Sequence, residues 1–344
     1  MRSLIIVCND FDGSWPLVAD YFHLQWKKQG NVEFIRLPGD NQKKISELVK
    51  DGKNITRMAT FGYEHVITPE EINFLTDLKE WAISGRVNNK TYCEIQDTLK
   101  TIGKSGIKVI SNPTEGFWKY SVAETGIGLT ICGLRQIPQK HQAIQTSLEE
   151  WNYTQEKGKA VPGIRGGQYC DDSQFTSGTI RDKRVRVVGM GNIASHYSSI
   201  CRFMGADVAA YDPFAHEPAF DLAGVRRISS LEELISDAEI FAPIIPNTEK
   251  TRGLITTELV NALPKGCLVV LITRAGICDM DAVRKRVLND EISLASDVFD
   301  VEPLPLGDPL LGRHNVVHTP HLAGRTKQAN ELWADKLLCQ FEKH

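Results

Sequence analysis

Three polar residues in the C-terminal half of the chain have the side chains needed to bind a small acid and to move a proton. Arg274 follows the apolar run 267–273, Glu302 lies in the segment DVFDVEP, and His321 lies in HTPHLAG. A guanidinium group can hold a carboxylate through two parallel hydrogen bonds. A carboxylate beside an imidazole stabilises its protonated form, so the pair can act as a general acid and base. These residue types predict an acid–base site that receives an acidic ligand.

Each of these residues also has a structural explanation when it is taken alone. Lone Arg and Glu side chains are usually solvated surface residues, and a lone His is more often structural than catalytic. His314, His318 and His321 lack an acidic or Cys ligand at suitable spacing, so we expect no metal. The acid–base site is favoured because Arg274, Glu302 and His321 all lie at or beyond the carboxyl ends of predicted strands. Open α/β sheets bind their ligands at that edge.

A glycine pattern predicts a dinucleotide site. Gly189, Gly191 and Ala194 form GxGxxA between a predicted strand and a predicted helix, whose N-terminus can receive a pyrophosphate. Asp212 ends the next strand, where its carboxylate can accept hydrogen bonds from ribose hydroxyls and would repel a 2′-phosphate. NAD is therefore expected and NADP is disfavoured, the structural alternative being a tight turn and a surface aspartate. The residues of this stretch expected to bind the cofactor are Gly189, Gly191, Asn192, Ile193 and Asp212.

The elements that must position these residues follow from the alternation of apolar runs and amphipathic stretches. Such alternation predicts βαβ units around a parallel sheet. The strands expected from residue 184 onward are 184–188, 208–211, 240–245, 267–273, 294–298 and 316–319. A weaker form of the same rhythm predicts a smaller α/β domain near the N-terminus, with strands 4–7, 32–35, 57–61, 80–84 and 108–110.

Two further segments have unusual composition. Residues 121–134 are almost uncharged, which predicts a helix buried in the core or against a second subunit. Residues 154–183 are rich in Gly and polar residues and lack periodicity. A connection of that length is typically functional or mobile, and the sequence does not say which.

Composition excludes several classes of protein. The chain has 344 residues, 42% of them hydrophobic, and a net charge of −3, so neither nucleic acid nor a membrane surface is an expected partner. No apolar run approaches the roughly 20 residues that cross a bilayer. The eight cysteines form no close CxxC pair, which favours reduced thiols in a cytoplasmic protein.

Several motifs in one order resemble those of the D-isomer-specific 2-hydroxyacid dehydrogenases. They span about residues 106–324 and comprise SVAE at 121–124, the glycine pattern with Asp212 and Pro213, PNTEKTRGLI from Pro246, TRAGICD from Thr273, DVFDVEP from Asp297 and NVVHTPH from Asn315. The resemblance implies an α/β fold of two Rossmann-like, doubly wound parallel-sheet domains with the active site in the cleft between them. Residues 1–110 and 325–344, including a C-terminal helix at 328–341, would form the substrate domain, and residues 111–324 the NAD-binding domain.

The resemblance also implies roles for individual residues. Arg274 would orient the substrate carboxylate and carbonyl, His321 would be the acid–base, and Glu302 would tune His321. The substrate would be a small 2-hydroxy or 2-oxo acid, and family members are commonly homodimers through the cofactor domain. The further cofactor-binding positions that match are Pro246, Thr251, Thr273, Asp297 and Gly324.

Substrate identity is not predicted, because the sequence departs from the family pattern. Ala275 stands where the family has Gly and Leu271 where it often has Asn. The carboxylate-binding loop of the small domain corresponds to residues 84–89, where Arg86 and Asn88 either contact substrate or form an exposed turn. The substrate-binding residues expected are Ser84, Gly85, Arg86 and Arg274.

Two alternatives stay open. A same-fold enzyme oxidising phosphite is compatible with these residues, whereas one oxidising formate would have Gln in place of Glu302. An NAD-binding regulatory protein related to the family's corepressors is disfavoured, because no basic run or extended disordered tail is present.

Overall fold

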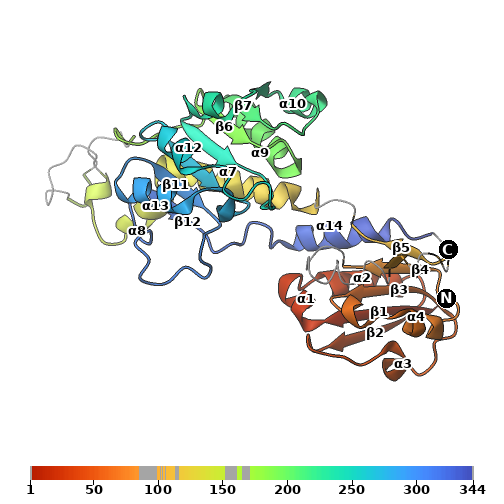
Figure 1. Ribbon diagram of the computed structural model, residues 1–344. Coiled ribbons are helices and arrows are strands. Elements are labelled where there is room, and N and C mark those ends of the chain that lie inside the picture. The colour runs from red at the N-terminus through yellow and green to blue at the C-terminus, as the bar shows by residue number, and fades with distance from the viewer. Residues whose placement is uncertain are drawn as a thin grey trace. The chain divides into compact units, whose positions relative to one another are not determined.

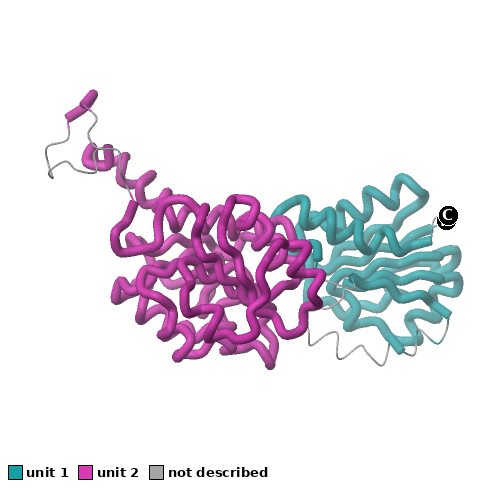
Figure 2. Tube along the Cα trace, turned by 90° about the horizontal axis from the view of Figure 1, so that it is seen from above, with its two compact units in different colours: residues 1–117, 325–344 teal, residues 118–324 magenta. Residues whose placement is uncertain are grey.

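The computed structural model describes residues 2–84, 99–100, 102, 104, 106–112, 116–151, 161–164 and 171–342. The chain divides into two compact units (Figure 2). Unit 1 comprises residues 1–117 and 325–344, and unit 2 comprises residues 118–324. The first boundary lies seven residues beyond the expected one at 110, and the second coincides with the expected boundary.

Unit 1 contains a five-stranded parallel sheet in the order β2-β1-β3-β4-β5 (Figure 1). The interior strand β1 is apolar from Leu4 to Cys8 and has six of its seven residues buried, as is typical of a parallel strand covered on both faces. The strands are β1 (Arg2–Cys8), β2 (Asn31–Leu37), β3 (Ile55–Phe61), β4 (Glu80–Ile83) and β5 (Lys108–Ile110), and the helices are α1 (Asn9–Ser14), α2 (Val18–Lys27), α3 (Ile45–Leu48), α4 (Pro69–Phe74) and α14 (Lys327–Leu338), with a 3₁₀ turn at Glu64–Val66.

The C-terminal helix α14 completes unit 1, although it is the last helix of the chain. It packs against α2, and its Trp333 lies fully buried among the aromatic rings of Phe11, Trp15 and Phe61. The side chain of Asn330 accepts a hydrogen bond from the backbone N–H of Leu17 at 3.3 Å. The two ends of the chain therefore share one core.

Unit 2 contains a seven-stranded parallel sheet in the order β12-β11-β10-β9-β6-β7-β8. The order reverses next to β6, which places a topological switch point between β6 and β9, where such folds bind ligands. The strands are β6 (Arg184–Val188), β7 (Asp207–Tyr211), β8 (Arg226–Arg227), β9 (Ile240–Pro243), β10 (Leu268–Leu271), β11 (Ser293–Ser296) and β12 (Val316–His318).

Helices cover both faces of the unit 2 sheet. One apolar core joins the sheet to α7, α9 and α10, and a second joins it to α11, α12 and α13. The helices are α7 (Lys119–Arg135), α8 (Ile137–Ala143), α9 (Asn192–Phe203), α10 (Glu217–Ala223), α11 (Leu231–Ile235), α12 (Thr257–Ala262) and α13 (Met280–Leu288), with 3₁₀ turns at Glu149–Trp151 and Ala275–Ile277. Both sheets thus have the doubly wound, Rossmann-like form that was expected.

Helix α7 contains the uncharged segment 121–134. It packs on α9 and on strands β10, β11 and β12, and it buries residues such as Val122, Leu129 and Leu134 in the core of its own unit. Its apolar composition is therefore explained without a second subunit.

Candidate active site

The turn after β6 has the geometry that the glycine pattern predicts. Gly189 has a φ of +102°, and a Cβ at this position would lie 2.5 Å from the carbonyl oxygen of Ile244, so only glycine fits. Gly191 is the N-cap of α9, and no heavy atom lies within 4 Å of a Cβ built there. Asn192 and Ile193 begin α9 without a side-chain cap, which leaves backbone N–H groups for an anion.

Asp212 lies directly beside this turn. One carboxylate oxygen accepts the N–H of Met190 at 2.8 Å, and the other accepts those of Phe214 and Ala215 at 2.9 and 3.1 Å. Because an ionised carboxylate offers about four lone-pair positions, capacity for a ribose hydroxyl remains. Asp212 therefore also shapes the loop in which we expect it to bind the cofactor.

Three other predicted cofactor positions, Pro246, Thr251 and Thr273, lie in loops at the carboxyl ends of β9 and β10. The hydroxyl of Thr251 donates to the carbonyl oxygen of Pro246 at 2.5 Å and closes the loop after β9. The hydroxyl of Thr273 donates to the carbonyl oxygen of Ile245 at 3.1 Å and joins the ends of the two strands. These residues therefore lie at the same edge of the sheet as the glycine turn.

Two predicted cofactor positions make contacts within the protein. Asp297 is fully buried, and its carboxylate accepts hydrogen bonds from the segment that carries His321. Gly324 lies against Trp118, and a Cβ at Gly324 would meet the indole ring at 2.0 Å. The indole explains why glycine is required there.

The side chains of His321 and Glu302, which are expected to act as an acid–base pair, lie within hydrogen-bond distance of each other. Nδ1 of His321 lies 2.7 Å from Oε2 of Glu302, and Oε1 of Glu302 accepts the N–H of Phe299 at 2.8 Å. Burial acts to raise the pKa of Glu302, but the hydrogen bonds from His321 and Phe299 and the charges of His321 and Arg274 outweigh it, so the net pKa is lowered. Glu302 is therefore ionised at neutral pH, and Nδ1 is the ring nitrogen of His321 that contacts it.

Arg274 lies at the carboxyl end of β10, at the start of the 3₁₀ turn Ala275–Ile277. Its side chain is exposed and donates one hydrogen bond, at 2.7 Å, to the carbonyl oxygen of Thr273. Its charge helps to lower the pKa of Glu302, so the two groups influence each other electrostatically. Unit 2 thus brings Arg274, Glu302 and His321 to one edge of one sheet.

A half-buried arginine is hydrogen-bonded to both sides of the loop that carries Glu302. Arg284, on α13, donates two hydrogen bonds to Asp308, at 3.0 and 2.9 Å, and three to Asp300. The two aspartates flank Glu302, and the Arg284 and Asp308 side chains are only 15% and 9% exposed. The sequence did not predict these ion pairs, because a loop rich in acidic residues usually indicates a solvated surface.

In unit 1 the structure describes only part of the predicted substrate loop. The N–H of Ser84 donates to Oε1 of Glu64 at 2.7 Å. Glu64 is buried, and burial raises the pKa of its carboxyl group above the usual value. Gly85, Arg86 and Asn88 lie outside the described residues. Glu64 was not predicted, and the signal that could have found it is its place after the carboxyl end of β3.

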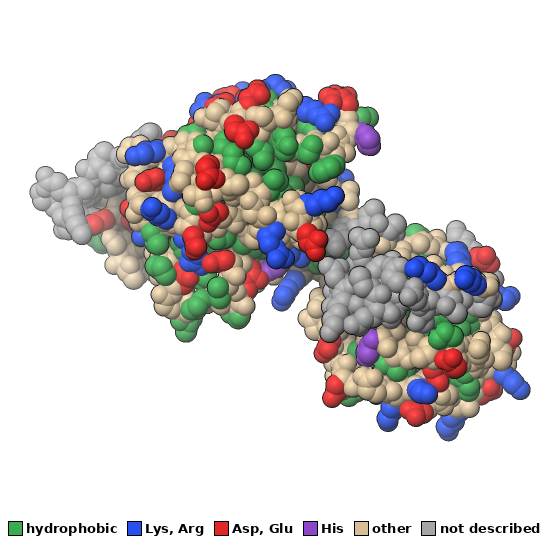
Figure 3. Space-filling model, viewed as in Figure 1, with side chains coloured by type: hydrophobic (Ala, Val, Ile, Leu, Met, Phe, Trp, Pro, Cys, Tyr) green, Lys and Arg blue, Asp and Glu red, His purple; other side chains and the backbone are tan. Residues whose placement is uncertain are grey.

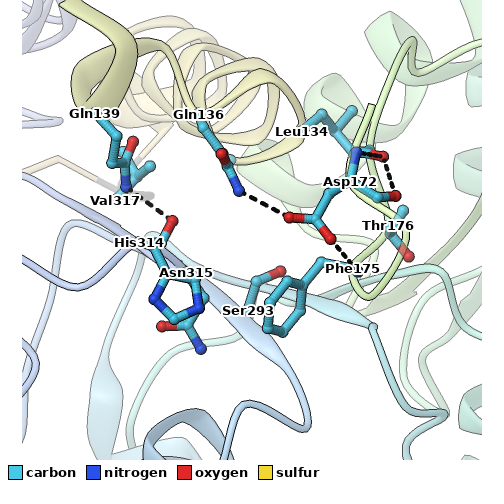
Figure 4. A pocket seen from close by; sticks show the side chains of 12 residues that line it. Leu134, Gln136, Gln139, Asp172, Phe175, Thr176, Ser293, His314, Asn315 and Val317 are labelled. Carbon is cyan, nitrogen blue, oxygen red and sulfur yellow. Dashed lines mark hydrogen bonds between the residues drawn. The ribbon is translucent and has the colours of Figure 1, made fainter. Parts of the chain in front are cut away.

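The pocket drawn in Figure 4 lies at the opposite edge of the unit 2 sheet. It is lined by the end of α7 and by residues at the amino ends of β11 and β12, such as Ser293 and Asn315. Gln136 donates to Asp172 here, and the N–H of Gly178 donates to the carbonyl oxygen of Leu134. Residues 171–183 at the end of the Gly-rich segment are therefore hydrogen-bonded to the end of α7, away from His321.

The described parts of the chain were also compared with the features of metal sites, membrane spans and charged surface patches. Within them, no three His, Cys, Asp or Glu side chains come together to hold a metal ion. Nor is any helix among these residues long and apolar enough to cross a membrane. On the face shown in Figure 3, basic and acidic side chains are interspersed rather than segregated.

This fold, with a glycine turn at its switch point, defines a dinucleotide-binding α/β protein, and sequence comparison identifies the family. Residues 129–323 match the NAD binding domain of the D-isomer specific 2-hydroxyacid dehydrogenases. The chain belongs to this family, and the cofactor of unit 2 is NAD.

Similar proteins include curated sequences and solved structures. The chain is 30% identical to the D-3-phosphoglycerate dehydrogenase of Bacillus subtilis over 92% of its own length and 52% of that protein, and it spans about half the length of the curated relatives it matches. A phosphoglycerate oxidoreductase from Rhizobium etli has a TM-score of 0.69 at 19% identity, covering 98% of this chain and 93% of that one. The NAD complex of a D-isomer specific 2-hydroxyacid dehydrogenase from Lactobacillus delbrueckii ssp. bulgaricus has a TM-score of 0.67 at 18% identity, covering 98% and 95%. These structures share the fold of this chain.

Proposed function

We propose that the protein is an NAD-dependent oxidoreductase that interconverts a small 2-hydroxy acid and its 2-oxo acid. The observation that carries the proposal is the hydrogen bond between His321 and Glu302, at 2.7 Å, on the same sheet edge as Arg274 and the glycine turn. An acid–base pair beside a cationic group, in a unit that binds NAD, supplies what this reaction needs. Membership of the family supports the same assignment.

The residues would share the reaction as follows. Arg274 would hold the substrate carboxylate and polarise the 2-oxo group. When bound, NADH supplies the hydride that reaches C2 of the substrate. His321 would donate the proton on Nε2 to the carbonyl oxygen as the C=O π bond breaks, giving a hydroxyl group. Glu302 would stabilise the imidazolium through Nδ1, and the oxidation would reverse each step.

The names of the curated relatives favour one substrate among these acids. The first eight relatives are D-3-phosphoglycerate dehydrogenases of bacteria and archaea, 27–30% identical to this chain. We therefore propose 3-phosphoglycerate and its 2-oxo counterpart as the first pair to test. Glyoxylate, hydroxypyruvate, and branched, aromatic and phosphonate-bearing 2-oxo acids complete the panel.

The test of the acid–base assignment is the His321→Gln variant. With the most active substrate of the panel, we expect kcat to fall by about two to four orders of magnitude, because the general acid is removed. The matched control is His314→Gln, which changes a histidine at the amino end of β12 that pairs with Asp290 and should keep wild-type turnover. Wild-type turnover in His321→Gln would overturn the assignment.

We also propose a homodimer formed through unit 2. Exposed apolar residues follow one another on and after α8, a segment that projects from unit 2 (Figure 2): Ile137, Ile144, Leu148 and Trp151 are 41–51% exposed. A second copy of this chain would bury them. Double substitution of Ile144 and Leu148 by Asp should give monomers in sedimentation analysis, whereas Phe203→Asp, on the exposed end of α9, should not. A dimer that persists in the double variant would refute this interface.

The thiols favour a reducing compartment, and we propose that the protein is cytoplasmic. All six described cysteines are free, and four of them are buried. Fractionation of the source cells with an antibody to the protein would test this location.

A further inference from the structure

The loop that carries Glu302 has little packing of its own. Among residues 301–307, all of which the structure describes, none is buried. The buried residues nearest to this stretch are Val298 before it and Leu310 after it. Packing in the core therefore does not explain why Oε2 of Glu302 lies 2.7 Å from Nδ1 of His321.

Arg284 connects the two sides of this loop from a helix that is itself fixed in the core. It lies on α13 directly after Val283, which is buried in the apolar core of unit 2. Its Nε and Nη2 donate to Asp300, two residues before Glu302, and its Nη1 donates to both carboxylate oxygens of Asp308, six residues after it. Burial acts to raise the pKa of Asp300 and to lower that of Arg284, but the hydrogen bonds outweigh it in both groups. Both side chains are therefore charged at neutral pH.

We propose that Arg284 is a positioning residue that holds the loop so that Glu302 meets His321. One guanidinium group bonded to two carboxylates fixes the residues on both sides of the stretch 301–307, which limits how far Glu302 can move. A lysine would keep the positive charge but has no planar fork to hold two carboxylates at once. This inference rests on the proposed function, because it makes Arg284 act through the acid–base pair.

Arg186 provides a matched control toward the opposite edge of the same sheet. Its guanidinium also bonds two aspartates, Asp207 and Asp237, and its side chain is 3% exposed. Asp207 begins β7 and Asp237 precedes β9, so these contacts lie at the amino ends of the strands, away from Glu302. Loss of this fork affects stability without displacing the acid–base pair.

The experiment compares kcat, KM and the Kd for NADH in single and combined variants, with the most active substrate of the panel. Arg284→Lys should lower kcat by about tenfold, and by no more than Glu302→Gln does, because it acts through that carboxylate. KM and the Kd for NADH should not change. In the Glu302→Gln background, Arg284→Lys should not lower kcat further, since the two changes affect one interaction. Arg186→Lys should lower the Tm and leave kcat unchanged.

A second measurement does not depend on turnover. The NMR signals of the His321 ring, assigned by their loss in His321→Gln, should shift in Glu302→Gln and in Arg284→Lys but not in Arg186→Lys. If Arg284→Lys does not fold, Asp300→Asn replaces it, because the Asp300 side chain is 31% exposed and its change leaves Asp308 paired. Asp300→Asn should shift the same signals and lower kcat by about threefold.

Three results would overturn the inference. The first is a wild-type kcat with unchanged His321 signals in Arg284→Lys, even with a lower Tm, since the role would then be structural alone. The second is a loss of kcat that adds fully to the loss in Glu302→Gln. The third is a rise in the Kd for NADH that accounts for the loss of activity. The same criteria apply to Asp300→Asn where it stands in for Arg284→Lys.

The failure of the proposed function is distinguishable from the failure of this inference. Full activity in His321→Gln would refute the acid–base assignment, and the NMR signals would still report whether Arg284 holds Glu302 against the ring. Loss of activity in His321→Gln with wild-type behaviour in Arg284→Lys would refute the positioning role alone.

Discussion

Replacing Glu302 by Gln tests how much its charge contributes to catalysis. Gln keeps the size of the side chain and one acceptor oxygen, but it removes the negative charge 2.7 Å from Nδ1 of His321. A hydrogen bond between charged groups contributes about 1.5–3 kcal/mol net. Because the two side chains are 37% and 36% exposed, solvent screens them and the lower part of that range applies. About 1.5–2 kcal/mol corresponds to a loss of about 10–30-fold in kcat.

The assay is steady-state reduction of the most active 2-oxo acid, followed by NADH absorbance from acid to alkaline pH. The imidazolium donates the proton in this direction, and Glu302 stabilises it. Because Gln has no charge to lose, the fall in rate at acid pH that accompanies protonation of Glu302 should be absent in Glu302→Gln, with little change in KM. The lowered pKa of Glu302 in the wild type means that its charge is present throughout the neutral range and is lost only at acid pH. A variant with the wild-type pH profile and kcat would refute this reasoning.

Three further predictions concern stability and reactivity. Gly189→Ala should lower the free energy of unfolding by about 1–3 kcal/mol and abolish NADH binding, because φ is +102° and the added Cβ would meet a carbonyl oxygen. Calorimetry would measure the stability and NADH fluorescence the binding. A variant that is as stable as the wild type and binds NADH would contradict this prediction. A hydrogen bond from Arg186 lowers the pKa of Asp237, so the stabilisation that this carboxylate provides is complete above its unfolded-state pKa and is lost as pH falls through its folded-state pKa. The Tm of Asp237→Asn should therefore depend less on pH below about 4 than the Tm of the wild type. Equal slopes of Tm against pH in the two proteins would argue against this. Burial raises the pKa of Cys267 to about 12, so iodoacetamide and peptide mapping should find exposed Cys339 modified well before it in the native protein.

The fold could be predicted because most of its strands are apolar runs in the sequence. All eleven expected strands are present, within about three residues at each end, since buried parallel strands need continuous apolar sequence. β8 was not predicted because its two residues, Arg226 and Arg227, are exposed and carry no apolar signal. The side chains of Ser230 and Asp279 cap α11 and α13 by accepting a backbone N–H, which is a local property of the sequence.

The candidate site was predictable only in its residue types. A histidine, a glutamate and an arginine after successive strands identify the sheet edge, but not the left-handed φ of His321. The segment around His321 is hydrogen-bonded to Asp297, more than twenty residues away in the chain, and this contact forms only when the fold brings the buried carboxylate to it. Glu64 and Arg284 were not predicted for a similar reason, because a charged residue is expected to be exposed. Only the fold buries Glu64 and leaves the Arg284 side chain 15% exposed.

Direct hydride transfer is the central claim, and isotope transfer from the cofactor measures it most directly. The protein would be incubated with NADH deuterated at C4 and the most active 2-oxo acid, and the product would be examined by mass spectrometry and NMR. The account predicts deuterium at C2 of the 2-hydroxy acid and none when the label is in the solvent. A product without cofactor deuterium, or no product from any acid of the panel, would contradict it.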